Sequence, residues 1–186
     1  MSQLDELVQR CQIGELAAFS ELFYAVEGRV YRLAMTILHN EQDAEDVVQD
    51  VFLRVFERIK HYKGDAAFQT WLTTIVVNIC RDRLRRNKVR RALSLDWIRN
   101  RGSEFDVVAE VSKRAQRQRL WTAVNQLDDK HRLPVILHYH ERLPCGEVAQ
   151  ILNIRVSVVY SRLNTARQRL RVLLQDTSAV NRLASE

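Results

Sequence analysis

The sequence is poor in residues that break helices. Its 186 residues include only five Gly and two Pro, and no sustained alternation of apolar and polar residues marks a strand. No apolar run approaches the roughly 20 residues that a membrane-spanning helix needs. The first residues also lack the basic-then-apolar pattern of a signal peptide. We therefore expect an all-α protein that is cytoplasmic and does not insert into a membrane.

Cysteine is also scarce, and the three thiols are unsuited to a disulfide framework or a zinc site. Cys11, Cys80 and Cys145 are odd in number, far apart and without ligand spacing. The sequence also lacks a phosphate-binding loop and a nucleophile–base pair, and its five histidines show no ligand pattern. These absences argue against an enzyme. We expect no catalytic residues, no metal and no cofactor, and we interpret the cysteines as buried or incidental.

Positive charge is concentrated in one segment. The whole chain carries a net charge of +6, and the segment from Arg81 to Arg91 holds seven basic residues against one acid, Asp82. A solvated helix face explains most such runs. Here the lack of balancing acids favours contact with phosphates.

Apolar residues recur at the three- and four-residue spacing of amphipathic helices. The periodicity weakens from about Ala92 to Glu110, which predicts a linker. The predicted domains are residues 1–92 and 111–175, with a flexible linker at 93–110 and a C-terminal tail at 176–186. The predicted helices span 4–11 (closed by Gly14), 16–37, 41–59 (with Asn40 as N-cap and Glu41 and Asp43 in the first turn), 68–91 and 111–126. A further helix is capped by Asp128 or Asp129, and Pro134 either lies near its first turn or kinks it.

Residues 144–163 have the spacing of a helix-turn-helix. The inward face of the first helix would be formed by Val148, Ala149 and Leu152, and Asn153 suits a left-handed turn. The second helix would pack against the first through Val159 and Leu163. An ordinary helical hairpin is the alternative. The polar outward face and the basic continuation favour DNA binding. The predicted base-reading residues are Ser157, Val158, Tyr160, Ser161, Arg162 and Thr165, and the predicted phosphate contacts that follow include Arg167 and Arg169.

Three motifs occur in an order that resembles a known family. They are Asp43-Ala-Glu-Asp-x-x-Gln-Asp-x-Phe-Leu, then Gly64-Asp-Ala-Ala-Phe-Gln-Thr-Trp-Leu-x-x-Ile-x-x-Asn78, and the segment from Leu127 to Leu174. The sequence resembles an extracytoplasmic-function (ECF, group IV) sigma factor of the sigma-70 family. The resemblance implies two helical domains, sigma region 2 and sigma region 4, that bind core RNA polymerase and promoter DNA.

The resemblance assigns further roles by position. The first motif corresponds to the helix that docks on polymerase, the second to the site for an extruded base of the minus-ten element, and the helix-turn-helix to minus-thirty-five duplex binding. The polymerase-docking residues would be Asp46, Gln49, Asp50, Leu53 and Arg54. The minus-ten residues would be Tyr62, Lys63, Gly64, Phe68, Asn78, Arg81, Arg83, Arg85 and Arg86.

The sequence departs from the family pattern where the recognition helix starts. The family's usual run is Val-Gly-Thr-Val-Lys-Ser-Arg, whereas Val158 and Tyr160 here replace a polar and a basic residue. The minus-thirty-five preference therefore cannot be transferred. Trp71 resembles a possible wedge residue, but its helical position favours the core. The resemblance also implies a monomer inhibited by an anti-sigma partner. The alternative function is a helix-turn-helix regulator with a sensor or dimerisation domain.

Overall fold

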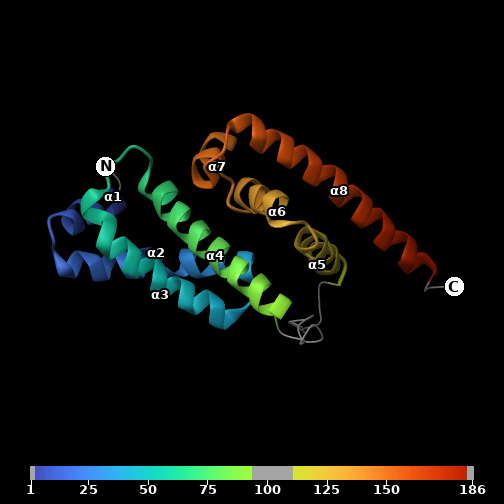
Figure 1. Ribbon diagram of the computed structural model, residues 1–186, viewed down its shortest axis with the longest axis horizontal. Coiled ribbons are helices and arrows are strands. Elements are labelled where there is room, and N and C mark those ends of the chain that lie inside the picture. Colours follow the sequence, from blue (N-terminus) through green and yellow to red (C-terminus); the bar gives the residue numbers. More distant parts are fainter. Residues whose placement is uncertain (1–2, 94–110, 184–186) are drawn as a thin grey trace. The chain divides into compact units, whose positions relative to one another are not determined.

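A computed structural model of the chain describes residues 3–93 and 111–183, and side chains within 3–89 and 116–175. All regular elements in these ranges are helical (Figure 1). The helices form two compact units, one holding α1 to α4 and the other α5, α6, α8 and α7 through Ala149. The predicted linker lies outside the described residues, apart from Leu93 at the end of α4. The all-α, two-domain prediction is confirmed.

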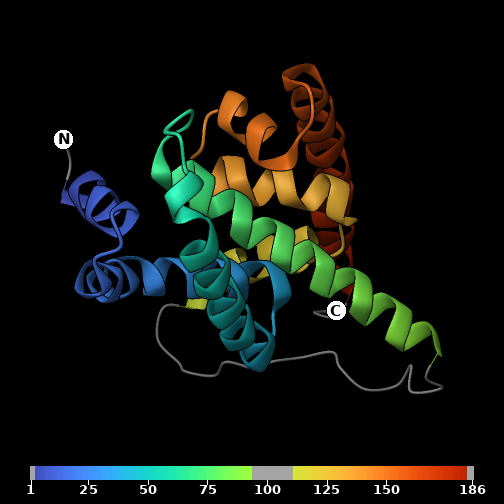
Figure 2. The same cartoon turned by 60° about the vertical axis from the view of Figure 1, so that its left-hand side comes forward.

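The first unit contains four helices. Figure 2 shows α4 as a long helix whose last turns extend beyond α2 and α3. The helices are α1 (Gln3–Gln12), α2 (Leu16–Leu38), α3 (Glu41–Arg58), which continues into a 3₁₀ turn η1 (Ile59–His61), and α4 (Phe68–Leu93). Their apolar faces meet in one core, whose largest fully buried side chains are Leu22, Val30, Leu33, Ile37, Val47, Val51, Val55, Ile59 and Val76. The predicted periodicity is the pattern of this core.

The break between α2 and α3 forms as predicted. His39 adopts the left-handed conformation with φ 53°, and its N–H donates to Met35 O. Asn40 is extended, and its Oδ1 accepts the Asp43 N–H at 2.8 Å. This bond satisfies a backbone donor that the first turn of a helix leaves unpaired. Glu41 and Asp43 place negative charge at the positive end of the α3 dipole.

The second unit contains the helix-turn-helix. Its helices are α5 (Val111–Asn125), α6 (Asp129–Val135) continued by a π-helical turn η2 (Ile136–His140), α7 (Cys145–Leu152) and α8 (Val156–Leu183). Asn153 has φ 52°, as the turn requires, and the Ile154 N–H donates to Ala149 O at 3.0 Å. Val148 and Val159 are fully buried, so the predicted inward faces are confirmed.

Three features of the second unit differ from expectation. Asp128 occupies the N-cap position, but its carboxylate bonds His131 and not a backbone amide. Pro134 lies past the first turn of α6, and the helix widens into the π turn directly after it. Proline lacks a backbone donor and its ring crowds the turn before it, so Pro134 weakens α6 shortly before the π turn begins. In addition, α8 runs to Leu183, into the segment expected to be a tail.

All three cysteines are buried and unpaired. Burial raises the pKa of Cys11, and it raises the pKa of Cys80 to about 12. A thiol that stays protonated at neutral pH is a poor nucleophile and a poor metal ligand. These observations support the interpretation of the cysteines as core residues.

Candidate functional site

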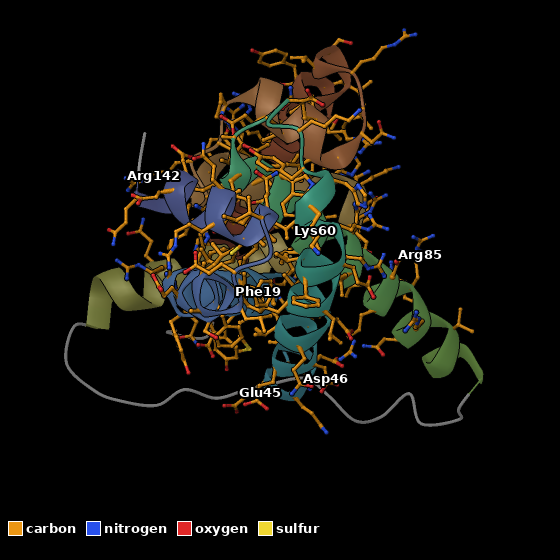
Figure 3. All side chains as sticks on the ribbon, turned by 90° about the vertical axis from the view of Figure 1, so that its left-hand side faces the viewer. Phe19, Glu45, Asp46, Lys60, Arg85 and Arg142 are labelled. Atoms are coloured by element: carbon orange, nitrogen blue, oxygen red, sulfur yellow. The ribbon has the colours of Figure 1, made fainter. Side chains whose placement is uncertain are left out.

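The five residues expected to dock on polymerase share one exposed side of α3. They follow the three- and four-residue spacing of a single helix face, and all five are exposed. Leu53, the apolar member of the five, is 66% exposed. Figure 3 shows Asp46 on this helix with Glu45 beside it. We call this surface, formed by Asp46, Gln49, Asp50, Leu53 and Arg54, the docking face.

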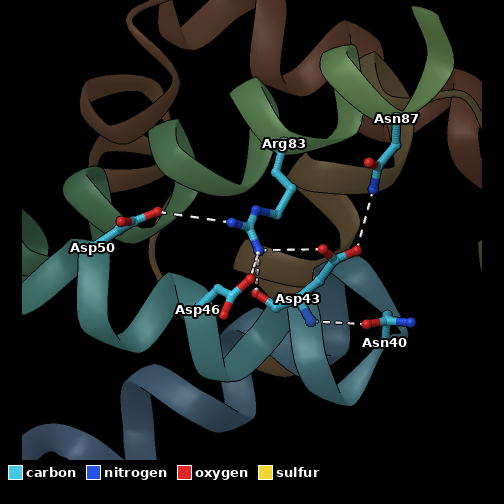
Figure 4. Close-up of polar contacts among 6 residues, drawn as sticks. All are labelled: Asn40, Asp43, Asp46, Asp50, Arg83 and Asn87. Atoms are coloured by element: carbon cyan, nitrogen blue, oxygen red, sulfur yellow. Dashed lines mark hydrogen bonds and ion pairs between the residues drawn. The ribbon is translucent and has the colours of Figure 1, made fainter. Parts of the chain in front are cut away.

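A half-buried arginine of α4 supports the docking face from within (Figure 4). Arg83 Nη1 lies 2.8 Å from Asp46 Oδ2 and 3.2 Å from Asp43 Oδ1, and Nη2 lies 4.0 Å from Asp50 Oδ2. Nη1 also donates to the Asp43 carbonyl at 3.3 Å, and Asn87 Nδ2 donates to Asp43 Oδ2 at 3.1 Å. The cluster therefore ties α4 to the first three turns of α3.

The position of Arg83 differs from the role expected for it. Its side chain is only 20% exposed, and it faces carboxylates where phosphate contact was expected. Burial lowers the pKa of Arg83, but the hydrogen bond to Asp46 and the nearby carboxylates more than offset this, so the net shift is upward. Asp43 and Asn87 complete the cluster and were missed by sequence reasoning. Asp43 is the first residue of the first motif, but the sequence does not show that it faces Arg83, 40 residues later.

Four other predicted nucleic-acid residues of α4 are exposed, whereas Phe68 at the start of the helix is buried. Asn78, Arg81, Arg85 and Arg86 all reach the surface, and Asn78, Arg81 and Arg85 follow one side of the helix. Arg85 is paired with Asp82 at 2.6 Å, but its side chain is 74% exposed. We call the surface formed by Asn78, Arg81, Arg85 and Arg86 the strand face, after the melted DNA strand that it is expected to contact.

The loop before α4 is closed by an aromatic cluster. The Tyr62 ring packs against Phe68 and Trp71, with centroids 5.9 and 5.2 Å away, and its hydroxyl donates to Ala66 O at 2.6 Å. Gly64 turns the loop with φ 78°, a conformation that a side chain disfavours. Trp71 is half-buried in this cluster, which agrees with the structural role favoured for it.

This cluster divides the predicted base-binding residues into two groups. Phe68 is 3% exposed, and Tyr62 is half-buried with its hydroxyl bonded to Ala66 O. These two rings therefore pack on the inner side of the loop. Lys63 and Gly64 are exposed. A base entering here meets the loop tip first, and stacking on Phe68 would require that ring to leave the core.

The recognition helix, the N-terminal part of α8, exposes half of the six residues predicted to read bases. Ser157, Tyr160 and Ser161 are exposed, whereas Val158, Arg162 and Thr165 are half-buried at its edges. Asn164 and Gln168 are exposed in line with Tyr160 and Ser161, and sequence reasoning missed them. The three- and four-residue spacing from Ser157 would have identified both residues. Asparagine and glutamine can form paired hydrogen bonds with adenine in the major groove.

Arg167 and Arg169, both expected to contact phosphates, have different surroundings. Arg167 is exposed, whereas Arg169 Nη1 lies 3.3 Å from His131 Nδ1 and 3.5 Å from Asp128 Oδ2. Burial disfavours ionisation of Asp128, yet the hydrogen bond with His131 and the neighbouring positive charges hold its pKa below the ordinary value. Arg169 therefore links α8 to the start of α6 and is only partly available to DNA.

Residues 3–93 and 111–183 include no group of three or more His, Cys, Asp or Glu side chains arranged to hold a metal ion. Within the same ranges, no helix combines the length and apolarity needed to cross a bilayer.

Half-buried Arg83 and exposed Arg85 are expected to differ in how much each contributes to stability. We expect Arg83→Met to destabilise the first unit by about 1–3 kcal/mol, because it leaves three neighbouring carboxylates without their cation. Arg85→Met should change stability by less than about 0.5 kcal/mol, since its ion pair is exposed. Urea denaturation measures both variants. Equal stability losses, or a larger loss of DNA affinity in Arg83→Met than in Arg85→Met, would contradict the assignment.

Comparison with known proteins identifies both units. Residues 22–90 match the family model described as Sigma-70 region 2, and residues 117–170 match Sigma-70, region 4. The ECF RNA polymerase sigma factor SigM of Mycobacterium tuberculosis is 31% identical over 169 residues, covering 91% of this chain and 83% of SigM. The ECF RNA polymerase sigma factor SigW of Bacillus subtilis is 28% identical over 183 residues, covering 91% of this chain and 95% of SigW.

Two solved structures share the fold. CnrH, solved in complex with the cytosolic domain of CnrY, has a TM-score of 0.66 and 24% identity, and the match covers 91% of this chain and 96% of CnrH. The sigma factor RpoE of Bartonella quintana, in complex with the anti-sigma factor NepR, has a TM-score of 0.67 and 21% identity, with 84% and 96% covered. The two family matches and the similarity to SigM show that the chain belongs to the ECF sigma factors of the sigma-70 family, which bind core RNA polymerase and direct it to promoters.

Proposed function

We propose that the three exposed surfaces divide the work of transcription initiation. The docking face binds core RNA polymerase, the loop tip and strand face hold the melted minus-ten strand, and the recognition helix reads minus-thirty-five duplex. Catalysis belongs to the polymerase, and the chain works beside it in the cytoplasm as a binding and positioning factor.

The observation that carries the proposal is the exposed docking face. An apolar Leu53 stands among acidic and polar side chains, within the unit that matches sigma-70 region 2. Such a surface favours a partner that offers basic side chains around an apolar contact. Arg83 already neutralises part of the acidic charge, so the partner's basic groups must approach Asp46 and Asp50 from the open side.

The nucleic-acid surfaces follow from charge and exposure. The strand face offers three exposed guanidinium groups and one exposed amide. The guanidinium groups suit the phosphates of a DNA strand, and the amide suits hydrogen bonds to the edge of one base. The recognition helix offers hydroxyl, amide and phenol groups, and Arg167 extends the surface for a phosphate. Run-off transcription with core polymerase on a genomic fragment library tests the whole proposal, and no specific initiation would refute it.

We further propose that the chain is a monomer held inactive by an anti-sigma protein. CnrH and RpoE of Bartonella quintana were each solved with a partner protein. An inhibitor that covers Leu53 would block polymerase docking and hide an exposed apolar side chain at once. Affinity purification from unstressed cells tests this proposal, and recovery of the chain without a stoichiometric inhibitor would contradict it.

The docking face predicts a charge-sensitive interaction. We expect Asp50→Lys combined with Leu53→Ala to abolish binding to core polymerase while both units stay folded, because the change opposes a basic partner and removes its apolar contact. Glu45→Lys is the matched control, since it reverses one exposed charge of α3 outside the docking face. Wild-type recovery of the double variant with core polymerase in a pull-down would show that docking occurs elsewhere.

The strand face predicts a defect confined to promoter opening. Asn78→Ala should reduce opening of the minus-ten region, because it removes one base-edge contact worth about 1–3 kcal/mol. Binding to minus-thirty-five duplex should stay within about twofold of wild type, because Asn78 lies outside the helix-turn-helix. Permanganate footprinting of the holoenzyme measures the opening. Unchanged thymine reactivity in the variant would remove Asn78 from the site.

The two arginines of α8 predict different salt responses. Arg167→Ala should weaken binding to all duplexes alike and reduce the slope of log K against log salt by about one, as expected for one lost phosphate contact. Arg169→Ala should change this slope less and lower the stability of the second unit, since Arg169 is held by His131 and Asp128. Fluorescence anisotropy over a salt series compares them, and identical slopes would count against the distinction.

A further inference from the structure

The last residue of α1 reaches across the first unit to the loop before α4. Gln12 Nε2 donates to Tyr62 O at 2.7 Å and to Ile59 O at 3.2 Å, so a single amide group holds two carbonyls about fifty residues away in sequence. Ile59 begins η1, and Tyr62 follows the last residue of η1, directly before Lys63 and Gly64. The carboxamide is half-buried, so these bonds face limited competition from water.

The helix that carries Gln12 is itself firmly anchored. Leu7, Val8 and Cys11 are buried, with exposures of 8%, 3% and 4%. Arg10 pairs with Glu15 and, at 3.2 Å, with Glu21, which binds the end of α1 to α2. The α1 helix lies before residue 22, where the match to Sigma-70 region 2 begins. An anchored donor outside the matched segment therefore fixes the backbone at one end of the loop.

The loop is held from its other side by the aromatic cluster. The Tyr62 hydroxyl closes onto Ala66, and its ring rests on Phe68 and Trp71. Tyr62 is therefore fixed twice, at its carbonyl by Gln12 and at its side chain by the loop and α4. Lys63 and Gly64 are exposed between these two supports.

We propose that Gln12 is a positioning residue for base recognition: it presets the 62–67 loop in the conformation that receives the extruded minus-ten base. The inference rests on the proposed role of this loop and adds α1 to the recognition apparatus. A preset loop loses less conformational freedom when the base enters, so discrimination between bases is greater. Without the two hydrogen bonds, the exposed segment samples other conformations and the base-edge contacts are made less often.

The test uses three variants of the full chain. Gln12→Met keeps the length and volume of the side chain and removes the donor. Gln12→Lys restores a donor of similar reach. Gln9→Met makes the same exchange at an exposed position three residues earlier on α1 and serves as the matched control. Urea denaturation and core polymerase binding are measured for each variant, so that a general folding defect is recognised.

Two readouts report on the loop itself. The first is the ¹⁵N order parameter of Lys63 and Gly64 in the free protein, which we expect to fall in Gln12→Met and to stay near wild type in Gln12→Lys and Gln9→Met. The second is base preference, measured by selecting single-stranded oligonucleotides from a random pool with the reconstituted holoenzyme. We expect the enrichment of the preferred base at the extruded position to fall about threefold to tenfold in Gln12→Met.

The outcomes separate this inference from the function on which it rests. A loss of base preference in Gln12→Met with recovery in Gln12→Lys supports the positioning role. Wild-type order parameters and base preference in Gln12→Met would overturn it, as would an equal loss in Gln9→Met. If Asn78→Ala also leaves base preference unchanged, the assignment of the strand face and its loop has failed. A defect in Asn78→Ala alone refutes only the role of Gln12.

Discussion

Arg83 lies between the docking face and the strand face, and its ion pairs hold α3 and α4 together. Three carboxylates of α3 stand within 4.0 Å of its guanidinium group. Carboxylates one helical turn apart repel each other, and a fixed, planar cation offsets this repulsion in a way that a flexible lysine would not. The local charge of the docking face therefore depends on a side chain of α4, the helix that also carries the strand face.

This arrangement lowers the net negative charge that the docking face presents to the polymerase partner proposed for it. The docking face is less acidic than its sequence suggests, since Asp46 already has a cation at 2.8 Å. A basic group of polymerase that approaches Asp46 must share the carboxylate with Arg83. Long-range attraction is weaker as a result, and the contact depends more on shape and on Leu53. Electrostatic complementarity of this kind contributes more to specificity than to affinity.

Most of the fold could be predicted from the sequence, because local signals determine it. Apolar periodicity located the helices, and Asn40 and Asn153 marked the cap and the left-handed turn that the structure contains. The partners of individual charges could not be predicted, because a basic run does not reveal which members face an acid 40 residues away. Phe68 was misplaced for a related reason: an aromatic residue beside a glycine loop suits stacking on a base and stacking in the core equally well.

In each unit, one member of a basic series binds side chains of another helix. Arg83 binds the acids of α3, and Arg169 binds His131 and Asp128 at the start of α6. Their neighbours Arg85, Arg86 and Arg167 remain exposed. Arg83 and Arg169 link the helices that carry Arg85, Arg86 and Arg167 to their neighbours, so the orientation of the proposed DNA-binding surfaces depends on these two ion-paired arginines. The number of phosphates that the chain neutralises must therefore be smaller than its number of arginines, since only outward guanidinium groups displace the counterions of DNA.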